Sequence, residues 1–118
     1  MIQDPVRHLF ETGLGDNRLE QVRWADGGLD LLLTLRPPGD NADAFTLQFV
    51  WATAVSLLMD FGSYAGSPLV FEARIAPLEH DRWTVTFLFG GAPNGHLSCE
   101  CNDVRLLRGS RHSNESPN

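Results

Sequence analysis

The residues best suited to chemistry lie close together in the second half of the chain: His96, Cys99 and Cys101. A thiol nucleophile needs a base within hydrogen-bond reach, and two thiolates with a histidine could bind zinc. Side chains three positions apart on a strand point to opposite faces, which disfavours a His96–Cys99 dyad. No second, well-spaced pair of ligands completes a zinc site. Cys99 and Cys101 share one face with parallel Cβ directions, a geometry that suits a disulfide poorly. We therefore expect buried free thiols and no metal.

Carboxylates in the turns are the next candidates. Asp40 and Asp43 lie in one loop, and Glu79 and Asp81 flank His80 in another. Paired carboxylates can perform general acid–base catalysis, but Asp is common in turns as a solvated residue. The sequence has no glycine-rich phosphate loop, zinc-protease motif, serine nucleophile motif or EF-hand spacing. We expect a protein that is not an enzyme and needs no cofactor.

The three tryptophans, Trp24, Trp51 and Trp83, could serve recognition instead of catalysis. Burial in the core is the default for tryptophan. An exposed aromatic side chain beside acidic groups, however, is typical of an interface anchor. Trp51 precedes Ala52-Thr53-Ala54, which interrupts the apolar pattern, so its environment is the least defined of the three.

Charge narrows the range of partners. The 118 residues include 15 acidic and 9 basic ones, all arginine, for a net charge of −6. Nucleic-acid binding requires basic patches, so this chain is a poor candidate for it. An acidic protein attracts a basic partner, although a net charge of this size more commonly serves only to keep a small domain soluble. No apolar run is long enough for a membrane helix, and the first residues do not form a secretory signal. These features predict a cytoplasmic protein without a membrane segment.

The elements that would position these residues are mostly strands, because apolar residues alternate at period two over most of the chain. A short helix begins at Asp4-Pro5, and the last polar residues, 108–118, form a C-terminal tail after a single β-rich domain, 1–107. The fold class is mainly β: an antiparallel sandwich or open barrel of about seven strands with one short N-terminal helix. The expected strands are Asn17–Ala25, Leu29–Arg36, Phe45–Phe49, Val55–Met59, Leu69–Ala76, Arg82–Phe89 and His96–Leu107.

Several finer expectations follow from the alternation. Leu29, Leu31, Leu33 and Leu35 should share a buried face, with Asp30, Thr34 and Arg36 opposite. Val55, Leu57 and Met59 should share another, although Val50–Met59 contains good helix formers and a helix remains the alternative there. In 69–76 either alternate set could be inward. The last strand should be irregular near Asn102-Asp103.

The order of these anchors resembles a known family. Phe45-x-Leu47-x-Phe49 precedes Val55, Leu58 and Asp60-Phe61, and then come a strand with Glu72 and Ile75, a strand led by Trp83, and a closing, loosely spaced S-x-C-x-x-V/I pattern near Ser98 to Val104. Over residues 29–107 this is similar to small β-rich immunity proteins of bacterial polymorphic toxin and contact-dependent growth inhibition systems. The resemblance implies a non-catalytic inhibitor that binds and neutralises a cognate toxin domain, often a basic nuclease, in the cytoplasm.

A toxin-binding surface would combine acidic residues with an aromatic anchor. We expect Trp51 or Tyr64 as the anchor and the following acidic set around it: Asp26, Asp30, Asp40, Asp43, Asp60, Glu79 and Asp81.

Two alternatives belong to other classes. A β domain without lysine lacks one common protection against edge pairing, which would suit a structural or accessory homo-oligomer such as a homodimer. A small ligand could instead bind between the sheets near His96, Cys99 and Trp83.

Overall fold

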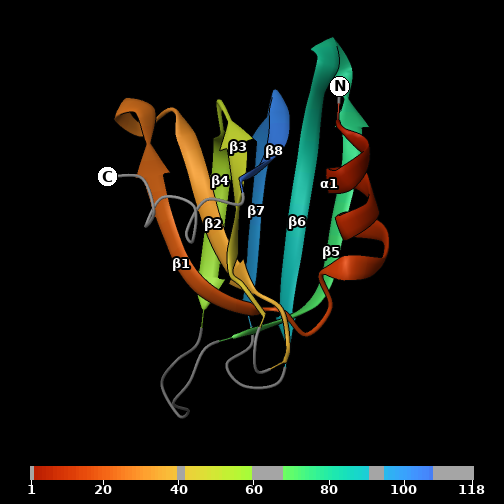
Figure 1. Ribbon diagram of the computed structural model, residues 1–118. Coiled ribbons are helices and arrows are strands. Elements are labelled where there is room, and N and C mark those ends of the chain that lie inside the picture. Colours follow the sequence, from red (N-terminus) through yellow and green to blue (C-terminus); the bar gives the residue numbers. More distant parts are fainter. Residues whose placement is uncertain (1, 40–41, 60–67, 91–94, 108–118) are drawn as a thin grey trace, which may run out of the picture.

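The computed structural model describes residues 2–39, 42–59, 68–90 and 95–107, and most of these residues lie in strands (Figure 1). The expected mainly-β antiparallel fold with a short N-terminal helix is confirmed. The chain runs through α1 (Asp4–His8), a π-helical turn η1 (Leu9–Gly13), β1 (Arg18–Ala25), η2 (Asp26–Gly28), β2 (Asp30–Arg36), β3 (Phe45–Val50), β4 (Thr53–Met59), β5 (Leu69–Leu78), η3 (Glu79–Asp81), β6 (Arg82–Gly90), β7 (Gly95–Cys101) and β8 (Asp103–Leu107).

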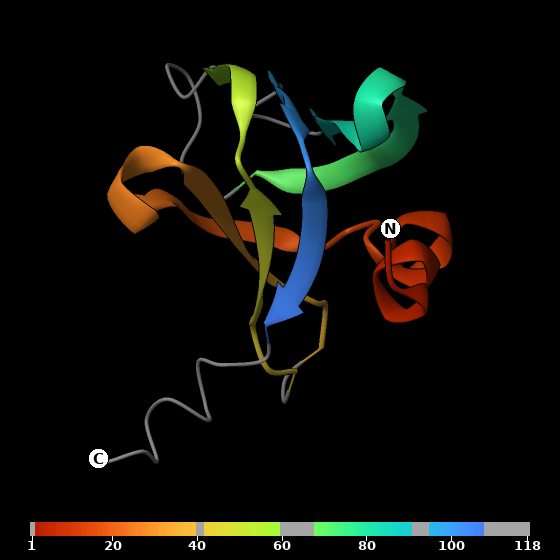
Figure 2. The same ribbon diagram turned by 90° about the horizontal axis from the view of Figure 1, so that it is seen from above.

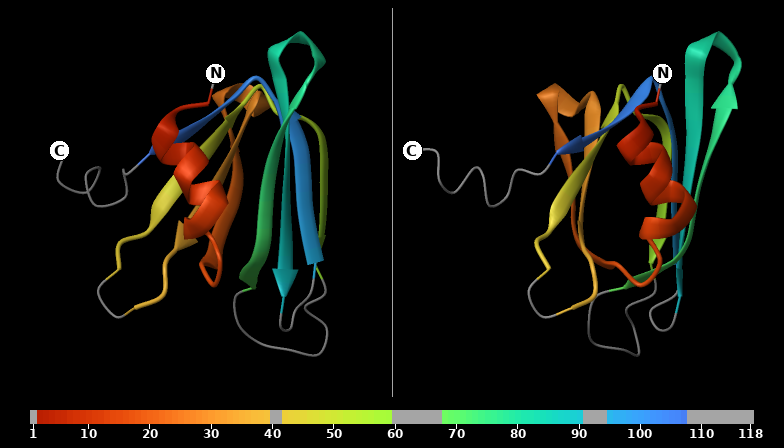
Figure 3. Two further views of the ribbon diagram at one scale, coloured as in Figure 1. Left: turned by 90° about the vertical axis from the view of Figure 1, so that its right-hand side faces the viewer. Right: turned by 45° about the vertical axis from the view of Figure 1, so that its right-hand side comes forward.

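The eight strands form one antiparallel sheet in the order β4-β7-β6-β5-β1-β2-β3-β8. Trp51 and Ala52 alone separate β3 from β4, and Asn102 alone separates β7 from β8. The two outer strands of the sheet, β4 and β8, are therefore continuations of β3 and β7. The sheet folds over into two layers, with β1, β2, β3 and β8 in one and β4 to β7 in the other (Figure 3).

The expected irregularity at Asn102-Asp103 is confirmed, and it divides the predicted last strand into β7 and β8. At this point the Asn102 N–H donates to the Val50 carbonyl at 2.8 Å, so both strand pairs turn together. The alternative of a helix over Val50–Met59 is wrong, because Thr53–Met59 forms β4.

The core lies between the layers. The inward faces predicted from alternation are buried in four strands, with Leu33, Leu47, Phe87 and Cys99 at most 2% exposed. Leu29, expected on the same face as Leu33, is an exception: it is 51% exposed, because it lies in the turn before β2. Phe87 of β6 joins the layers: its ring centroid lies 6.3 Å from that of Phe49 on β3, 6.2 Å from that of Phe89 and 5.7 Å from that of Phe10 on η1.

The N-terminal helix covers one side of this core. Pro5 stands in its first turn, where its missing N–H needs no partner. Val6 and Phe10, at helical spacing, are buried. The helical segment lies beside β5 (Figures 1 and 2), with α1 touching β8 and η1 touching β5. The helical segment thereby connects β8, at the edge of one layer, to β5, at the edge of the other.

The structure decides one face that alternation left open and corrects another. In β5 the register shifts between Val70 and Glu72, so Val70 is buried while Phe71 is 73% exposed, lying over Gly90. A bulge changes the face on which the following residues lie. In β4, Leu57 is 48% exposed, because this strand pairs with β7 alone and has no described strand on its outer side.

Within the described residues, no helix is both long and apolar enough to cross a membrane.

A pair of phenylalanine variants tests this packing. We expect Phe87→Ala to lower the free energy of unfolding by about 3–5 kcal/mol, since it removes the ring shared by both layers and the helix. Phe71→Ala, the matched control on the surface, should lower it by less than about 1 kcal/mol. Urea unfolding followed by circular dichroism measures both. Similar losses for the two variants would contradict this arrangement of the core.

Candidate functional site

One end of the sheet gathers two hairpin turns and the two strand junctions. It comprises the β1–β2 turn (Asp26–Leu29), the β3–β4 junction (Trp51, Ala52), the β5–β6 turn (Glu79–Asp81) and the β7–β8 junction (Asn102), and we call it the corner end. These turns lie at the same end because the strands are antiparallel, so that every second connection along the chain falls at that end of the sheet.

Trp51 is the most distinctive residue of the corner end. Its side chain is 56% exposed and its φ is +55°, in the left-handed region that bulky residues rarely occupy. Such a conformation costs on the order of 1–3 kcal/mol and persists where surrounding contacts hold it. Leu29, also half exposed, lies next to it, because its carbonyl accepts the Ala52 N–H at 2.8 Å.

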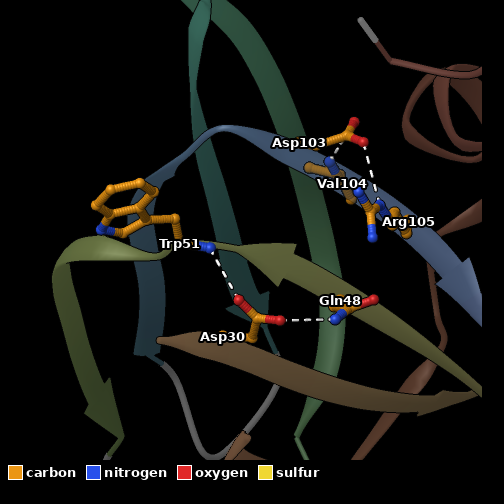
Figure 4. A network of polar contacts seen from close by, with 6 residues as sticks. All are labelled: Asp30, Gln48, Trp51, Asp103, Val104 and Arg105. Atoms are coloured by element: carbon orange, nitrogen blue, oxygen red, sulfur yellow. Dashed lines mark hydrogen bonds and ion pairs between the residues drawn. The ribbon is translucent and has the colours of Figure 1, made fainter. Parts of the chain in front are cut away.

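The contact that holds Trp51 comes from a buried carboxylate. Asp30, at the start of β2, is 7% exposed. Its Oδ1 accepts the Trp51 N–H at 3.0 Å and its Oδ2 accepts the Gln48 Nε2–H at 2.7 Å (Figure 4). A buried carboxylate needs such donors, and charge-assisted hydrogen bonds are stronger than neutral ones. Asp30 therefore fixes the backbone that presents Trp51.

Arg82 holds the same junction from the second layer. Its guanidinium donates to the Asn102 Oδ1 at 2.5 Å, to the Thr53 Oγ1 at 2.6 Å and to the Trp51 carbonyl at 3.4 Å. The arginine thus links β6 to both junctions, and all three of its acceptors are neutral oxygens.

A surface pocket of about 720 Å³ lies beside this arginine. Its walls come from α1, from the β5–β6 hairpin and from the β7–β8 junction. His80 and Asp81, in the hairpin turn, both have positive φ (64° and 59°), which His and Asp tolerate better than most residues. The ionisable side chains of the lining are Arg7, His80, Asp81 and Arg82.

The predicted acidic surface is divided by this geometry. Glu79, Asp81 and Asp26 are exposed at the corner end, together with Trp51. Asp43 lies between β2 and β3, at the opposite end. The following predicted residues lie outside the described part of the chain: Asp40, Asp60 and Tyr64.

Asp30 was expected on the polar face of its strand, and this is wrong: it is buried and supports Trp51 from below. Burial of a carboxylate cannot be deduced from period-two alternation, because it depends on donors from Gln48 and Trp51 on another strand.

Sequence reasoning also missed three groups at the corner end. Glu100 and Asp103 are the cross-strand partners of Thr53 and Val50, the residues that flank the β3–β4 junction. Arg82 had no sequence signal beyond its place after a turn. If the pairing of β7 and β8 with β4 and β3 is known, the strand register alone places Glu100 and Asp103 opposite the residues beside Trp51.

The cysteines face the core as expected. Both are buried free thiols. Hydrogen bonding with Cys101 and burial raise the pKa of the Cys99 thiol above its ordinary value. A thiol with a raised pKa is a poor nucleophile, because the thiolate is the reactive form. Among the described residues, no group of three or more His, Cys, Asp or Glu side chains could hold a metal ion.

His96 contacts a serine and points away from the cysteines. Its Nε2 lies 3.2 Å from the Ser56 Oγ across β4 and β7. A base within reach of a hydroxyl is the first half of a nucleophilic pair, and a third group normally orients the base. No described carboxylate forms an ion pair with His96. Neither His96 nor Cys99 lines the pocket beside Trp83.

Comparison of the sequence with protein family models and with curated proteins finds no match.

The Asp30 contact can be tested directly. We expect Asp30→Ala to lower the free energy of unfolding by about 2–4 kcal/mol, since two donors lose a charged acceptor. Asp30→Asn, which keeps the shape and one acceptor oxygen, should lower it by about 1–2 kcal/mol. Thermal or urea unfolding measures these losses, and amide hydrogen exchange should show faster exchange at Trp51.

Glu79→Ala is the matched control, because Glu79 is an exposed carboxylate at the same end of the sheet. It should change neither stability nor the exchange of Trp51. Equal behaviour of Asp30→Ala and Glu79→Ala would show that the buried carboxylate does not hold the junction.

Proposed function

We propose that this chain is a non-catalytic immunity protein that binds and neutralises a cognate toxin domain through its corner end. The observation that carries the proposal is the exposed Trp51, with φ +55°, whose N–H is held by the buried carboxylate of Asp30. The class of partner comes from the resemblance in sequence to bacterial immunity proteins. A cytoplasmic location belongs to the same proposal.

The anchor has the properties of a binding hot spot. Tryptophan is enriched among residues that dominate binding energy. Trp51 and its neighbour Leu29 are each exposed by about half of their surface. A side chain on a backbone that is already fixed loses less conformational freedom on binding, so more of its contact energy remains as affinity.

Charge around the anchor favours a basic partner. Asp26 is exposed in the turn before Leu29, and Glu100 and Asp103 pair across from the residues that flank Trp51. The whole chain carries −6. Complementary charge of this kind accelerates encounter and rejects partners of the wrong sign. A basic toxin nuclease domain fits both the anchor and its acidic surroundings.

The first test is binding to the C-terminal domain of any large secreted protein encoded immediately upstream. We expect nanomolar affinity by calorimetry, weaker at about 300 mM than at about 50 mM salt, because exposed charges are screened. Trp51→Ala should weaken binding by about 2–4 kcal/mol, or roughly 30- to 1,000-fold.

Phe71→Ala is the matched control, since Phe71 is an exposed aromatic residue away from the corner end. It should bind like the unchanged protein. Absence of binding, or equal binding by Trp51→Ala and the unchanged protein, would refute the proposed surface.

A second candidate function, a homodimer of structural or accessory role, is favoured by the outer edge of β4. Leu57 and Leu58 are 48% and 63% exposed there, on opposite faces of a strand without a described partner on that side. An apolar, unpaired edge can pair with the same edge of a second copy, and charged residues normally prevent this.

Light scattering over a range of concentrations tests the dimer. If it forms, Leu58→Lys should yield monomers, because two lysines would face one another across the new edge. Phe71→Lys, which adds the same charge elsewhere, should leave the dimer intact. A chain that is monomeric at all concentrations would exclude this candidate.

A further inference from the structure

We propose that the pocket between α1 and the β5–β6 hairpin binds a small organic molecule that carries an oxyanion, either a carboxylate or a phosphate. The site shares His80, Asp81 and Asn102 with the corner end, but Trp51 does not line it, and it does not depend on the function proposed above. It rests on the arginines of the lining, on the apolar wall beside them, and on the size of the pocket.

Arg82 is the central group of this site. Three other described arginines, Arg36, Arg74 and Arg105, each form an ion pair with a carboxylate. Arg82 is half-buried and bonds to neutral oxygens alone, and its Nε–H has no acceptor among the described residues. A cation fixed in place without a counterion is prepared to receive an anion, because little reorganisation is needed on binding.

The charge of the lining is opposite in sign to that of the protein. Arg7 of α1 contributes a second cation, and among the described residues it forms no ion pair. Asp81 is the single carboxylate of the lining, so arginine exceeds carboxylate by one in a chain whose net charge is −6. The lining of the pocket therefore favours an anion more than the net charge of the chain would suggest.

The other wall of the pocket is apolar. Trp83 is half-buried, and Pro77 and Leu78 of β5 are exposed beside it. The volume of about 720 Å³ lies within the range of roughly 300–1,000 Å³ that is usual for small-molecule sites. An inorganic ion would leave most of this space empty. The pocket fits a molecule with the oxyanion at Arg7 and Arg82 and a ring or short chain against Trp83.

The experiment compares three probes that share one ring: phenyl phosphate, phenylacetate and the neutral 2-phenylethanol. Each is titrated into the full chain while the indole NMR signals of the tryptophans are followed. We expect both anions to shift the signal of Trp83 and the neutral probe to bind at least about tenfold more weakly, since a charged hydrogen bond is lost. The tighter of the two anions identifies the source as a phosphate ester or a carboxylate.

Arg7→Gln is the decisive variant, because Arg7 is exposed and has no described hydrogen bond whose loss would unfold the protein. It should weaken both anions by about tenfold and leave the neutral probe unchanged. Arg23→Gln, an exposed arginine on β1, is the matched control and should bind like the unchanged protein. Arg82→Lys keeps the charge but loses the planar set of donors, and it should also weaken the anions.

Three results would overturn the proposal. The first is that neither anion shifts Trp83 at about 10 mM, where even millimolar affinity would saturate the site. The second is that 2-phenylethanol binds as tightly as the anions. The third is that Arg7→Gln and Arg23→Gln bind the anions equally well.

Discussion

The structure depends on how two consecutive backbone N–H groups are satisfied where β3 passes into β4. At such a junction the regular ladder stops, and buried donors without partners are strongly unfavourable. The start of β2 supplies both acceptors: the Asp30 carboxylate takes the Trp51 N–H, and the Leu29 carbonyl takes the Ala52 N–H. Because these contacts fix the angle of the junction, the sheet can fold over and Phe87 can meet Phe49 from the other layer.

The same constraint shapes both of the proposed binding surfaces. Fixing the backbone at Trp51 turns its side chain outward, where it is available to a protein partner. The carbonyl of Trp51 and the side chain of Asn102 then hold the Arg82 guanidinium at the edge of the pocket. An apolar anchor with acidic neighbours and a cationic pocket thus arise from one junction, on adjacent sides of the same end of the sheet.

The parts of this arrangement that could be predicted are those governed by local period. Leu33, Leu47 and Phe87 lie inward because alternation on a strand is a property of neighbouring residues. Asp30 could not be placed, because its burial depends on donors from β3 and the following junction. Alternation left both faces of residues 69–76 open, and it does not predict the bulge between Val70 and Glu72 that leaves Val70 buried and Phe71 exposed. The pocket combines α1 with β6, and no sequence spacing relates them. The position of Asp43, in contrast, could have been predicted. Successive turns between antiparallel strands lie at alternate ends of the sheet, so Asp26, before β2, and Asp43, after β2, must lie at opposite ends.

The strand order also sets the sequence of events in folding. β8 pairs with β3, as Leu107 with Thr46, across four intervening strands, and β7 pairs with β4 across two. A nascent chain that has emerged from the ribosome only as far as β6 can form the β1–β2, β2–β3 and β5–β6 pairs and the single β1–β5 contact. However, β3, β4 and β6 then still lack the partners that β7 and β8 provide. Contacts of such long range slow folding, because loops must close before the contacts can form. Residues 95–107 therefore complete the core. If a ribosome pauses before they are synthesised, apolar surface of the earlier strands stays exposed and can be bound by chaperones.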